Sequence, residues 1–428
     1  MKLLILHAVS LSTILVLAAC GGGSGGGSGG SQPSSSAASS ESSSSESSSS
    51  ESSSSESSSS SESSSSESSS SVSSWAVTEA HLYDNASFPI GVAVSAGNES
   101  YSIVEDSEAG EKRRQVVVQH FSNMTAGNIM KMSYLHPEED SYTYGDADEL
   151  VQFAADNGMT IHGHALVWHS DYQVPAWMKN YSGDWEAMLR EHVTNIVSHF
   201  AGSGVVPSWD VVNEAFVDDG SYRSADSVFH QNMGESYLEV AFQAARDADP
   251  AAELYYNDYS LAQGGAKLDA VIAMAEDFID RDVPIDGIGF QGHIQIDWPS
   301  ATNIEQSFAQ AAATGLKVRL TELDVPINNP YGGSYDYPNN YHAELTLELA
   351  NQQKQRYCQV VEAYMNAVPE AQRGGISVWG VEDPSSWLIG QLFDNNHDDW
   401  PLLFDEHLSA KPALQGVADA LNGQPCEP

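Results

Sequence analysis

Two glutamates stand out because each follows a run of apolar residues. Glu214 closes the stretch SWDVVNE, and Glu322 lies in KVRLTELDV, 108 residues further on. Burying a carboxylate among apolar residues is costly unless a partner compensates it. Two facing carboxylates can cleave a glycosidic bond, because one protonates the leaving oxygen while the other attacks the anomeric carbon or activates water. We therefore interpret Glu214 and Glu322 as a candidate catalytic pair.

Other polar and aromatic residues near the ends of such runs are suited to a sugar. Tryptophan and tyrosine rings offer flat apolar faces on which pyranose rings stack, and amide, imidazole and amine groups bond to hydroxyls. The candidate stacking residues are Trp168, Trp379, Trp387 and Tyr259. The candidate hydrogen-bonding residues are Asn128, Lys131, His164, Asn213 and Gln291. Trp209, inside an apolar run, is expected in the core instead.

Metal chemistry is the competing interpretation. His162, His164 and His169 lie close in sequence, but the first two share one face of a strand and the third falls on the other. The HExxH motif is absent, so no catalytic metal and no cofactor are predicted. Two acidic loops, 328–340 and 394–400, could hold Ca²⁺, although solvated loops are favoured in so acidic a chain.

Short apolar runs recur along the chain and predict strands. There are eight of them, at 88–94, 120–127, 159–168, 208–214, 253–260, 287–294, 317–325 and 375–383. Helical periodicity lies between several of them, at 147–158, 185–204, 236–250 and 303–315. Strands that alternate with helices indicate a parallel sheet.

Eight such units in about 350 residues predict an α/β fold, a (β/α)8 TIM barrel. A doubly wound open sheet is the alternative, but GVAVSAGNES is not the phosphate-binding glycine fingerprint expected after its first strand. Active sites of these barrels lie at the carboxyl ends of the strands. The fourth and seventh strands face each other across a small barrel, so Glu214 and Glu322 can point into one cleft.

Six segments, in order, resemble the endo-β-1,4-xylanases of glycoside hydrolase family 10. They are GHALVWHSD (163–171), WDVVNEAF (209–216), LYYNDY (254–259), GIGFQGH (287–293), LTELDV (320–325) and VWGVEDPSSW (378–387). The resemblance covers residues 75–424. It implies a catalytic TIM barrel that hydrolyses xylan with retention of anomeric configuration.

The resemblance also implies roles for individual residues. Glu214 matches the acid/base, Glu322 the nucleophile, and Asn213 the residue that bonds the sugar 2-hydroxyl. His293 and Asp324 match a pair that supports the nucleophile. Contacts with the sugar next to the scissile bond are expected from His164, Trp168, Gln291, Trp379 and Trp387, donor-side contacts from Asn128 and Lys131, and an acceptor-side contact from Tyr259. We expect the anionic Glu322 to raise the pKa of Glu214.

One position departs from the family pattern. The family has Glu before the Asn of the second-strand motif, whereas TAGNIMK places Gly127 there. We therefore expect weaker binding of the second donor-side sugar, or room for a different one. Two alternative functions remain open: a β-1,4-glucanase or cellobiosidase on the same barrel, and a non-catalytic surface sugar-binding protein. The intact Glu214 and Glu322 argue against the second.

The N-terminal part reads as an export signal and a tether. Residues 1–19 have Lys2, an apolar run and small residues, which is typical of a signal peptide, and LAAC places Cys20 where bacterial lipoproteins are lipidated. Residues 20–71 repeat Gly-Ser and Glu-Ser units that are unable to bury a core, so a disordered tether is expected. The pattern predicts a chain that is lipid-anchored at the bacterial cell envelope, with the outer membrane as the favoured site, or secreted.

The charge of the chain limits the kinds of partner that it is expected to bind. The chain has a formal net charge of −42, and the part after the tether keeps 53 acidic against 16 basic residues. Such charge argues against nucleic acid as a partner and is compatible with adaptation to salt. The predicted partners are xylan and xylo-oligosaccharides, with membrane contact only through the anchor, and a monomer is expected. Cys358 and Cys426 could form a disulfide in an oxidising compartment or remain as two thiols.

Overall fold

The computed structural model describes residues 81–328, 341–389 and 399–428. The predicted signal peptide, Cys20, the tether, and nearly all of the two acidic loops lie outside these residues. Within them, eight parallel strands close into a barrel in chain order. The strands are β1 (Ile90–Val94), β2 (Asn123–Ala126), β3 (Thr160–Trp168), β4 (Ser208–Asn213), β5 (Glu253–Asp258), β6 (Gly287–Phe290), β7 (Lys317–Leu323) and β8 (Arg373–Val378). The predicted TIM barrel is confirmed.

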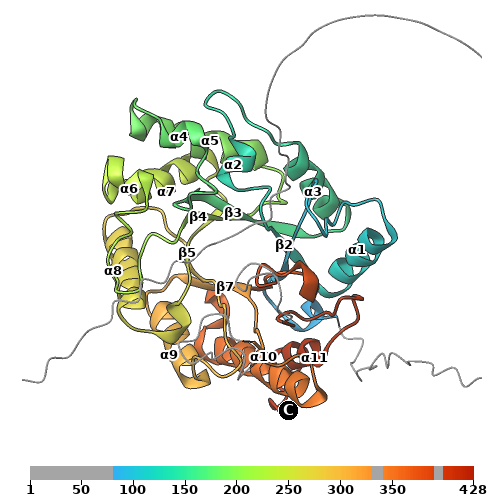
Figure 1. Cartoon of the computed structure of the whole chain (residues 1–428). Helices are drawn as coiled ribbons and strands as arrows, with labels where there is room; N and C mark the ends of the chain where they lie inside the picture. Colours follow the sequence, from blue (N-terminus) through green and yellow to red (C-terminus); the bar gives the residue numbers. More distant parts are fainter. Residues whose placement is uncertain (1–80, 329–340, 390–398) are drawn as a thin grey trace, which may run out of the picture. The chain divides into compact units, whose positions relative to one another are not determined.

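Helices surround the barrel in Figure 1. They are α1 (Glu108–His120), α2 (Met132–Leu135), α3 (Gly145–Asp156), α4 (Ala176–Lys179), α5 (Trp185–Phe200), α6 (Val228–Met233), α7 (Ser236–Ala248), α8 (Ala266–Asp280), α9 (Ala301–Ala312), α10 (Leu347–Ala367) and α11 (Pro412–Leu421). Short 3-10 turns span Tyr83–Asn85, Leu261–Gln263, Glu370–Gln372 and Asp383–Ser385. None of the helices in the described part is long and apolar enough to cross a membrane.

The predicted strands begin within two residues of the observed ones, with one difference, although several predicted runs extend past the observed carboxyl ends by up to five residues. The second apolar run was expected to begin at position 120, but His120 ends helix α1 and β2 begins only at Asn123. The histidine is buried and suits the carboxyl end of a helix as well as it suits a strand. Several helices begin at a polar cap; for example Ser107 accepts from Gly110 N at 3.0 Å and Asp184 from Ala187 N at 3.1 Å.

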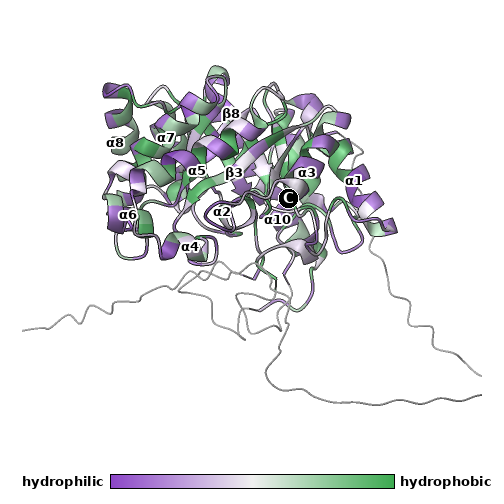
Figure 2. Ribbon diagram, turned by 90° about the horizontal axis from the view of Figure 1, so that it is seen from above, coloured by the Kyte–Doolittle hydropathy of each residue, from purple (hydrophilic) through white to green (hydrophobic). Residues whose placement is uncertain are grey.

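Hydrophobic packing between helices and strands holds the ring together. The helices carry both hydrophobic and hydrophilic residues (Figure 2), and their buried faces cover the barrel. Trp209, expected in the core, is 1% exposed. A Cβ at Gly163 on the neighbouring strand would lie 2.1 Å from the Trp209 ring, so only glycine allows the two strands to pair there.

The buried guanidinium group of Arg319 lies inside the barrel. Arg319 of β7 donates to Asn123 Oδ1 of β2 at 2.7 Å and to the Gly374 carbonyl of β8 at 2.9 Å. A Cβ at Gly91 of β1 would meet Ser377 Oγ, another acceptor of Arg319, at 2.5 Å. Because Gly91 has no side chain, there is room for the Ser377 hydroxyl that bonds to Arg319. The bonds of Arg319 fix β7 three residues before Glu322.

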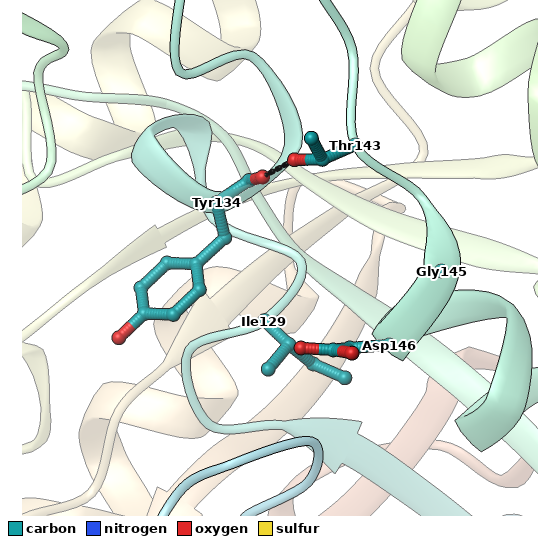
Figure 3. Close-up of a pocket in the computed structure, with 5 residues that line it drawn as sticks. All are labelled: Ile129, Tyr134, Thr143, Gly145 and Asp146. Atoms are coloured by element: carbon teal, nitrogen blue, oxygen red, sulfur yellow. Dashed lines mark hydrogen bonds between the residues drawn. The ribbon is translucent and has the colours of Figure 1, made fainter. Parts of the chain in front are cut away.

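A pocket lies beside α2 and α3. It has a volume of about 270 Å³ and is lined by Ile129, Tyr134, Thr143, Gly145 and Asp146 (Figure 3). Thr143 Oγ1 donates to the Tyr134 carbonyl across it. None of the predicted site residues lines this pocket, although Ile129 is the neighbour of Asn128.

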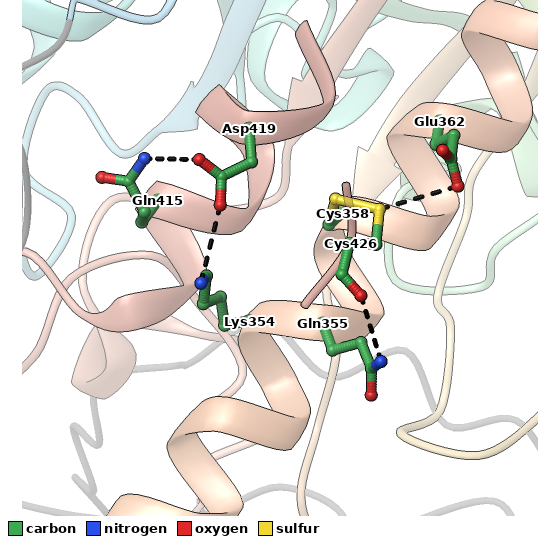
Figure 4. The surroundings of a disulfide bond; sticks show 7 residues. All are labelled: Lys354, Gln355, Cys358, Glu362, Gln415, Asp419 and Cys426. Atoms are coloured by element: carbon green, nitrogen blue, oxygen red, sulfur yellow. Dashed lines mark hydrogen bonds and ion pairs between the residues drawn. A yellow bond between two sulfur atoms is a disulfide. The ribbon is translucent and has the colours of Figure 1, made fainter. Parts of the chain in front are cut away.

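The C-terminal tail is attached to α10 by a disulfide. The sulfur atoms of Cys358 and Cys426 are bonded, and Gln355 Nε2 donates to the Cys426 carbonyl at 3.1 Å (Figure 4). Lys354 of α10 lies 3.6 Å from Asp419 of α11, so the same helix pair also carries an ion pair. Cys358 is buried, whereas Cys426 is half-buried.

Removing this disulfide should destabilise the fold. The bond closes a loop with a sequence separation of 68 residues, and chain entropy predicts a stabilisation of about 4 kcal/mol for such a loop. We expect Cys426→Ser to lower the melting temperature, and a reductant to bring the unaltered chain to the same value. The variant itself should not respond to the reductant. Equal melting temperatures for both chains without reductant would contradict this prediction.

Candidate active site

Glu214 is held in an unusual backbone conformation just past β4. Its φ is 59°, a left-handed value that is unfavourable for a residue with a side chain. The Glu214 N–H donates to the Asn257 carbonyl at 2.9 Å, and the Glu214 carbonyl accepts from Arg223 Nε at 3.1 Å. These two bonds fix the turn, which directs the carboxylate away from the strand and towards the barrel mouth.

Glu322 lies near the end of β7 and is 4% exposed. Its Oε1 accepts from Asn257 Nδ2 at 2.8 Å, and its Oε2 lies 3.4 Å from His293 Nε2. The other nitrogen of that histidine, Nδ1, lies 3.0 Å from Asp324 Oδ2. Trp387 Nε1 donates to the same Asp324 oxygen at 2.9 Å. The predicted grouping of His293 and Asp324 around Glu322 is therefore present in the structure.

Three amides connect the two carboxylates. Asn257 Nδ2 donates both to Glu322 Oε1 and, at 2.9 Å, to Asn213 Oδ1. Gln291 Nε2 donates to Glu214 Oε1 at 2.9 Å and lies 3.4 Å from Asn213 Oδ1. The carboxylates thus share one hydrogen-bonded network at the carboxyl ends of β4 to β7, which the barrel topology predicted.

The imidazole beside Glu322 is strongly perturbed. Burial by itself would lower the pKa of His293, but the anionic Asp324 and Glu322 outweigh it and raise that pKa to about 10. The ring is therefore an imidazolium at neutral pH. It places a positive charge between two carboxylates, one of which is Glu322, the predicted nucleophile.

The expected rise in the pKa of Glu214 is wrong for the unliganded protein. Burial raises this pKa, but His169 at 4.0 Å and the hydrogen bond from Gln291 overcome burial, so the pKa is lowered overall. Repulsion by Glu322 alone was the basis of the expected rise. The groups that the fold brings to the same carboxylate have the opposite effect on its pKa.

Donor-side candidates form a chain of contacts at the end of β2. Lys131 Nζ donates to Asn128 Oδ1 at 3.1 Å and lies 5.0 Å from the centre of the Trp168 ring. Asn128 Nδ2 donates to Glu99 Oε1 at 2.6 Å. Glu99 comes from the loop between β1 and α1, and the sequence analysis did not single it out.

Two of the three histidines of the metal alternative share one carboxylate, and the third faces another. His162 Nε2 and His164 Nδ1 lie 3.0 and 2.9 Å from the two oxygens of Asp210, whereas His169 faces Glu214. His164 also meets the edge of Trp379, with ring centres 5.3 Å apart. In the described ranges no group of three or more His, Cys, Asp or Glu side chains is arranged to hold a metal ion.

Tyr259, the acceptor-side candidate, lies among cations. Its hydroxyl accepts from Arg223 at 2.8 Å, and the Lys267 ammonium lies 3.2 Å from its ring centre. Lys267 in turn pairs with the buried Asp258 at 2.7 Å. The same Arg223 that holds the Glu214 backbone thus also orients Tyr259.

Sequence reasoning missed three residues of this site. Asn257 lies in the LYYNDY segment but was given no role, and Arg223 and Glu99 were not considered. The NDY segment within the fifth apolar run was a usable signal for Asn257. No local pattern marks Arg223 or Glu99, because both reach the site from loops.

The imidazolium at His293 should make stability depend on alkaline pH. Its folded-state pKa of about 10 lies above the ordinary value of 6.5, so its contribution is complete below pH 6.5 and is lost as the pH rises through 10. Across that window the free energy of unfolding should fall by about 1.4 kcal/mol per pH unit from this group. Denaturant unfolding between pH 6 and 10 measures the slope. An equal slope in His293→Gln would contradict the assignment.

Comparison with known proteins agrees with this geometry. Residues 80–420 match glycosyl hydrolase family 10. The chain is 48% identical over 360 residues to endo-beta-1,4-xylanase Xyn10C of Cellvibrio japonicus, covering 81% of this chain and 58% of that protein. It is 44% identical to endo-1,4-beta-xylanase A of the same species, covering 79% and 56%. The chain therefore spans little more than half the length of these relatives.

The structure of the chain also resembles solved structures of other proteins. Xylanase 10C from Cellvibrio japonicus in complex with xylopentaose superposes with a TM-score of 0.77 at 46% identity, covering 81% of this chain and 70% of that one. Native xylanase 10B from Thermotoga maritima superposes with a TM-score of 0.69 at 32% identity, covering 81% and 98%. The family match, the closed barrel and the linked glutamates agree, and the chain belongs to glycosyl hydrolase family 10.

Proposed function

We propose that the protein is a retaining endo-xylanase, which hydrolyses β-1,4-xylosidic linkages within xylan chains. The observation that carries the proposal is the pairing of Glu214 and Glu322 through Gln291, Asn213 and Asn257 at the mouth of the barrel. The names of the relatives, and the xylopentaose bound by one solved neighbour, favour xylan as the substrate.

In the proposed reaction Glu322 attacks the anomeric carbon and forms a glycosyl ester. The bond to the leaving oxygen breaks, and that oxygen takes a proton from Glu214. Glu214 then removes a proton from water, which attacks the anomeric carbon and releases Glu322. Two inversions at one carbon give net retention. Asn213 would hold the sugar 2-hydroxyl, while the sugar stacks near Trp379 and Trp387.

Glu214 must carry a proton when the first step begins. Its pKa is lowered in the unliganded protein, and burial is the influence that acts in the opposite direction. A sugar in the cleft would exclude water from this carboxyl group and so favour the protonated acid. Once Glu322 is esterified, its negative charge is gone. The pKa of Glu214 then falls, which suits its second role as base.

The division of roles can be tested by removing each carboxylate. We expect Glu322→Ala to lose at least about 1,000-fold in hydrolysis, because no nucleophile remains. Azide should restore turnover of an aryl xylobioside and give the product of inverted configuration. Glu214→Ala should instead form a product of retained configuration with azide. The opposite pattern would exchange the two roles.

Substrate preference separates the proposed xylanase from a β-1,4-glucanase or cellobiosidase on the same barrel. We expect glucuronoxylan and arabinoxylan to be shortened within the chain, and mixed-linkage glucan and cellulose to be left nearly intact. Product profiling on these four polysaccharides measures the preference. Faster cleavage of the glucans would favour the alternative, and binding without any products would favour a non-catalytic sugar-binding protein.

We also propose, on the sequence alone, that residues 1–19 direct export and that Cys20 carries a lipid. The Gly/Ser-rich segment 20–71 would then separate the barrel from the membrane by a flexible span of roughly 40 Å. A monomeric enzyme at the cell envelope, or one released from it, is the arrangement that suits a polymeric substrate.

A further inference from the structure

We propose that Glu99 is a positioning residue of the donor-side sugar site, because it fixes the orientation of the Asn128 amide. Nothing in the family resemblance assigns a role to this glutamate, which comes from the loop between β1 and α1. The inference rests on the proposed function and adds a specificity-determining residue to it.

Asn128 lies between two groups of opposite hydrogen-bonding character. A carboxylate only accepts hydrogen bonds and an ammonium only donates them, whereas an amide does one at each end. Asn128 gives Nδ2–H to Glu99 Oε1 at 2.6 Å and receives Lys131 Nζ at Oδ1, at 3.1 Å. Rotating the amide by half a turn would place its oxygen against the Glu99 carboxylate, so that two acceptors face each other. It would also place its NH2 group against the Lys131 ammonium, so that two donors face each other. Glu99 and Lys131 together therefore permit one orientation of the amide.

The loop that carries Glu99 has a fixed shape. Its ends are joined by a bridge between Ser95 and Ser102, and Ile103 N donates to the Ser95 carbonyl at 2.8 Å. Inside the loop, Glu99 Oε2 accepts from Ala96 N at 3.2 Å. Gly97 has a φ of +59°, and a Cβ there would lie 2.4 Å from Asp146 Oδ2. The Glu99 carboxylate is therefore delivered to Asn128 by backbone that is already ordered.

The position next to Asn128 has no side chain of its own. A Cβ at Gly127 would lie 3.3 Å from the Val94 carbonyl oxygen. Apart from its chain neighbours, no side chain lies within 4 Å of that Cβ position. The sequence led us to expect that the missing carboxylate at Gly127 weakens binding of the second donor-side sugar, or leaves room for a different one. Glu99 changes the expectation, since it brings a carboxylate to Asn128 from a different loop.

The test compares two substrates that differ only on the donor side. A 4-nitrophenyl β-xyloside places one sugar next to the scissile bond, and the β-xylobioside adds the second donor-side sugar. We expect Glu99→Ala to lower kcat/KM about tenfold more for the xylobioside than for the xyloside, as one lost or misdirected hydrogen bond would. Glu99→Gln keeps an acceptor for Asn128 and should lose less. Glu108→Ala, which removes the same charge from the exposed start of α1, should change neither value.

A double-mutant cycle shows whether Glu99 acts through Asn128. If it does, Glu99→Ala in an Asn128→Ala background should leave the xylobioside to xyloside ratio unchanged. Equal losses on both substrates in Glu99→Ala and Glu99→Gln would overturn the proposal and leave Glu99 a role in folding only. Unchanged kcat/KM on both substrates in both variants would overturn it as well. If the unaltered enzyme cleaves neither substrate, the proposed function fails instead.

Discussion

The site depends most on the hydrogen bonds of the Asn257 side-chain amide. Its two N–H groups bond to Glu322 and Asn213, and its oxygen accepts from Thr321 Oγ1 at 2.7 Å. Gly289 on the next strand leaves space for it, because a Cβ there would lie 2.5 Å from that oxygen. Strands β4 to β7 thus meet at one fully bonded side chain. The relative placement of the two glutamates follows from these bonds.

The cationic side chains around the site each have a partner close by. The imidazolium of His293 lies between Asp324 and Glu322, Lys131 faces Trp168 on the donor side, and Arg223 supports Tyr259 on the acceptor side. Each cation has an anion, an aromatic face or carbonyl groups as partners. Buried charge is therefore compensated locally, which Coulomb's law requires in surroundings of low dielectric constant.

Much of the fold could be predicted from the printed sequence. Buried parallel strands are continuous apolar runs, so seven of the eight predicted runs begin within two residues of the observed strand. His120 misled the second prediction, because a buried histidine suits a helix end as well as a strand. Helices α3, α5, α7 and α9 were predicted, whereas the other helices were not. Among those, α2, α4 and α6 have only four to six residues, which carry too little periodicity to distinguish them from loops.

The sequence by itself determined the barrel, the strand ends that carry Glu214 and Glu322, and the aromatic and amide residues around them. These features are local, since a strand's pattern and its last residue are read from consecutive positions. Tertiary structure alone decided the direction in which the pKa of Glu214 moves and the partners of Asn128. His169, Gln291 and Glu99 reach those groups from other strands and loops, and electrostatic and hydrogen-bonding effects depend on distance in space, which spacing along the chain does not specify.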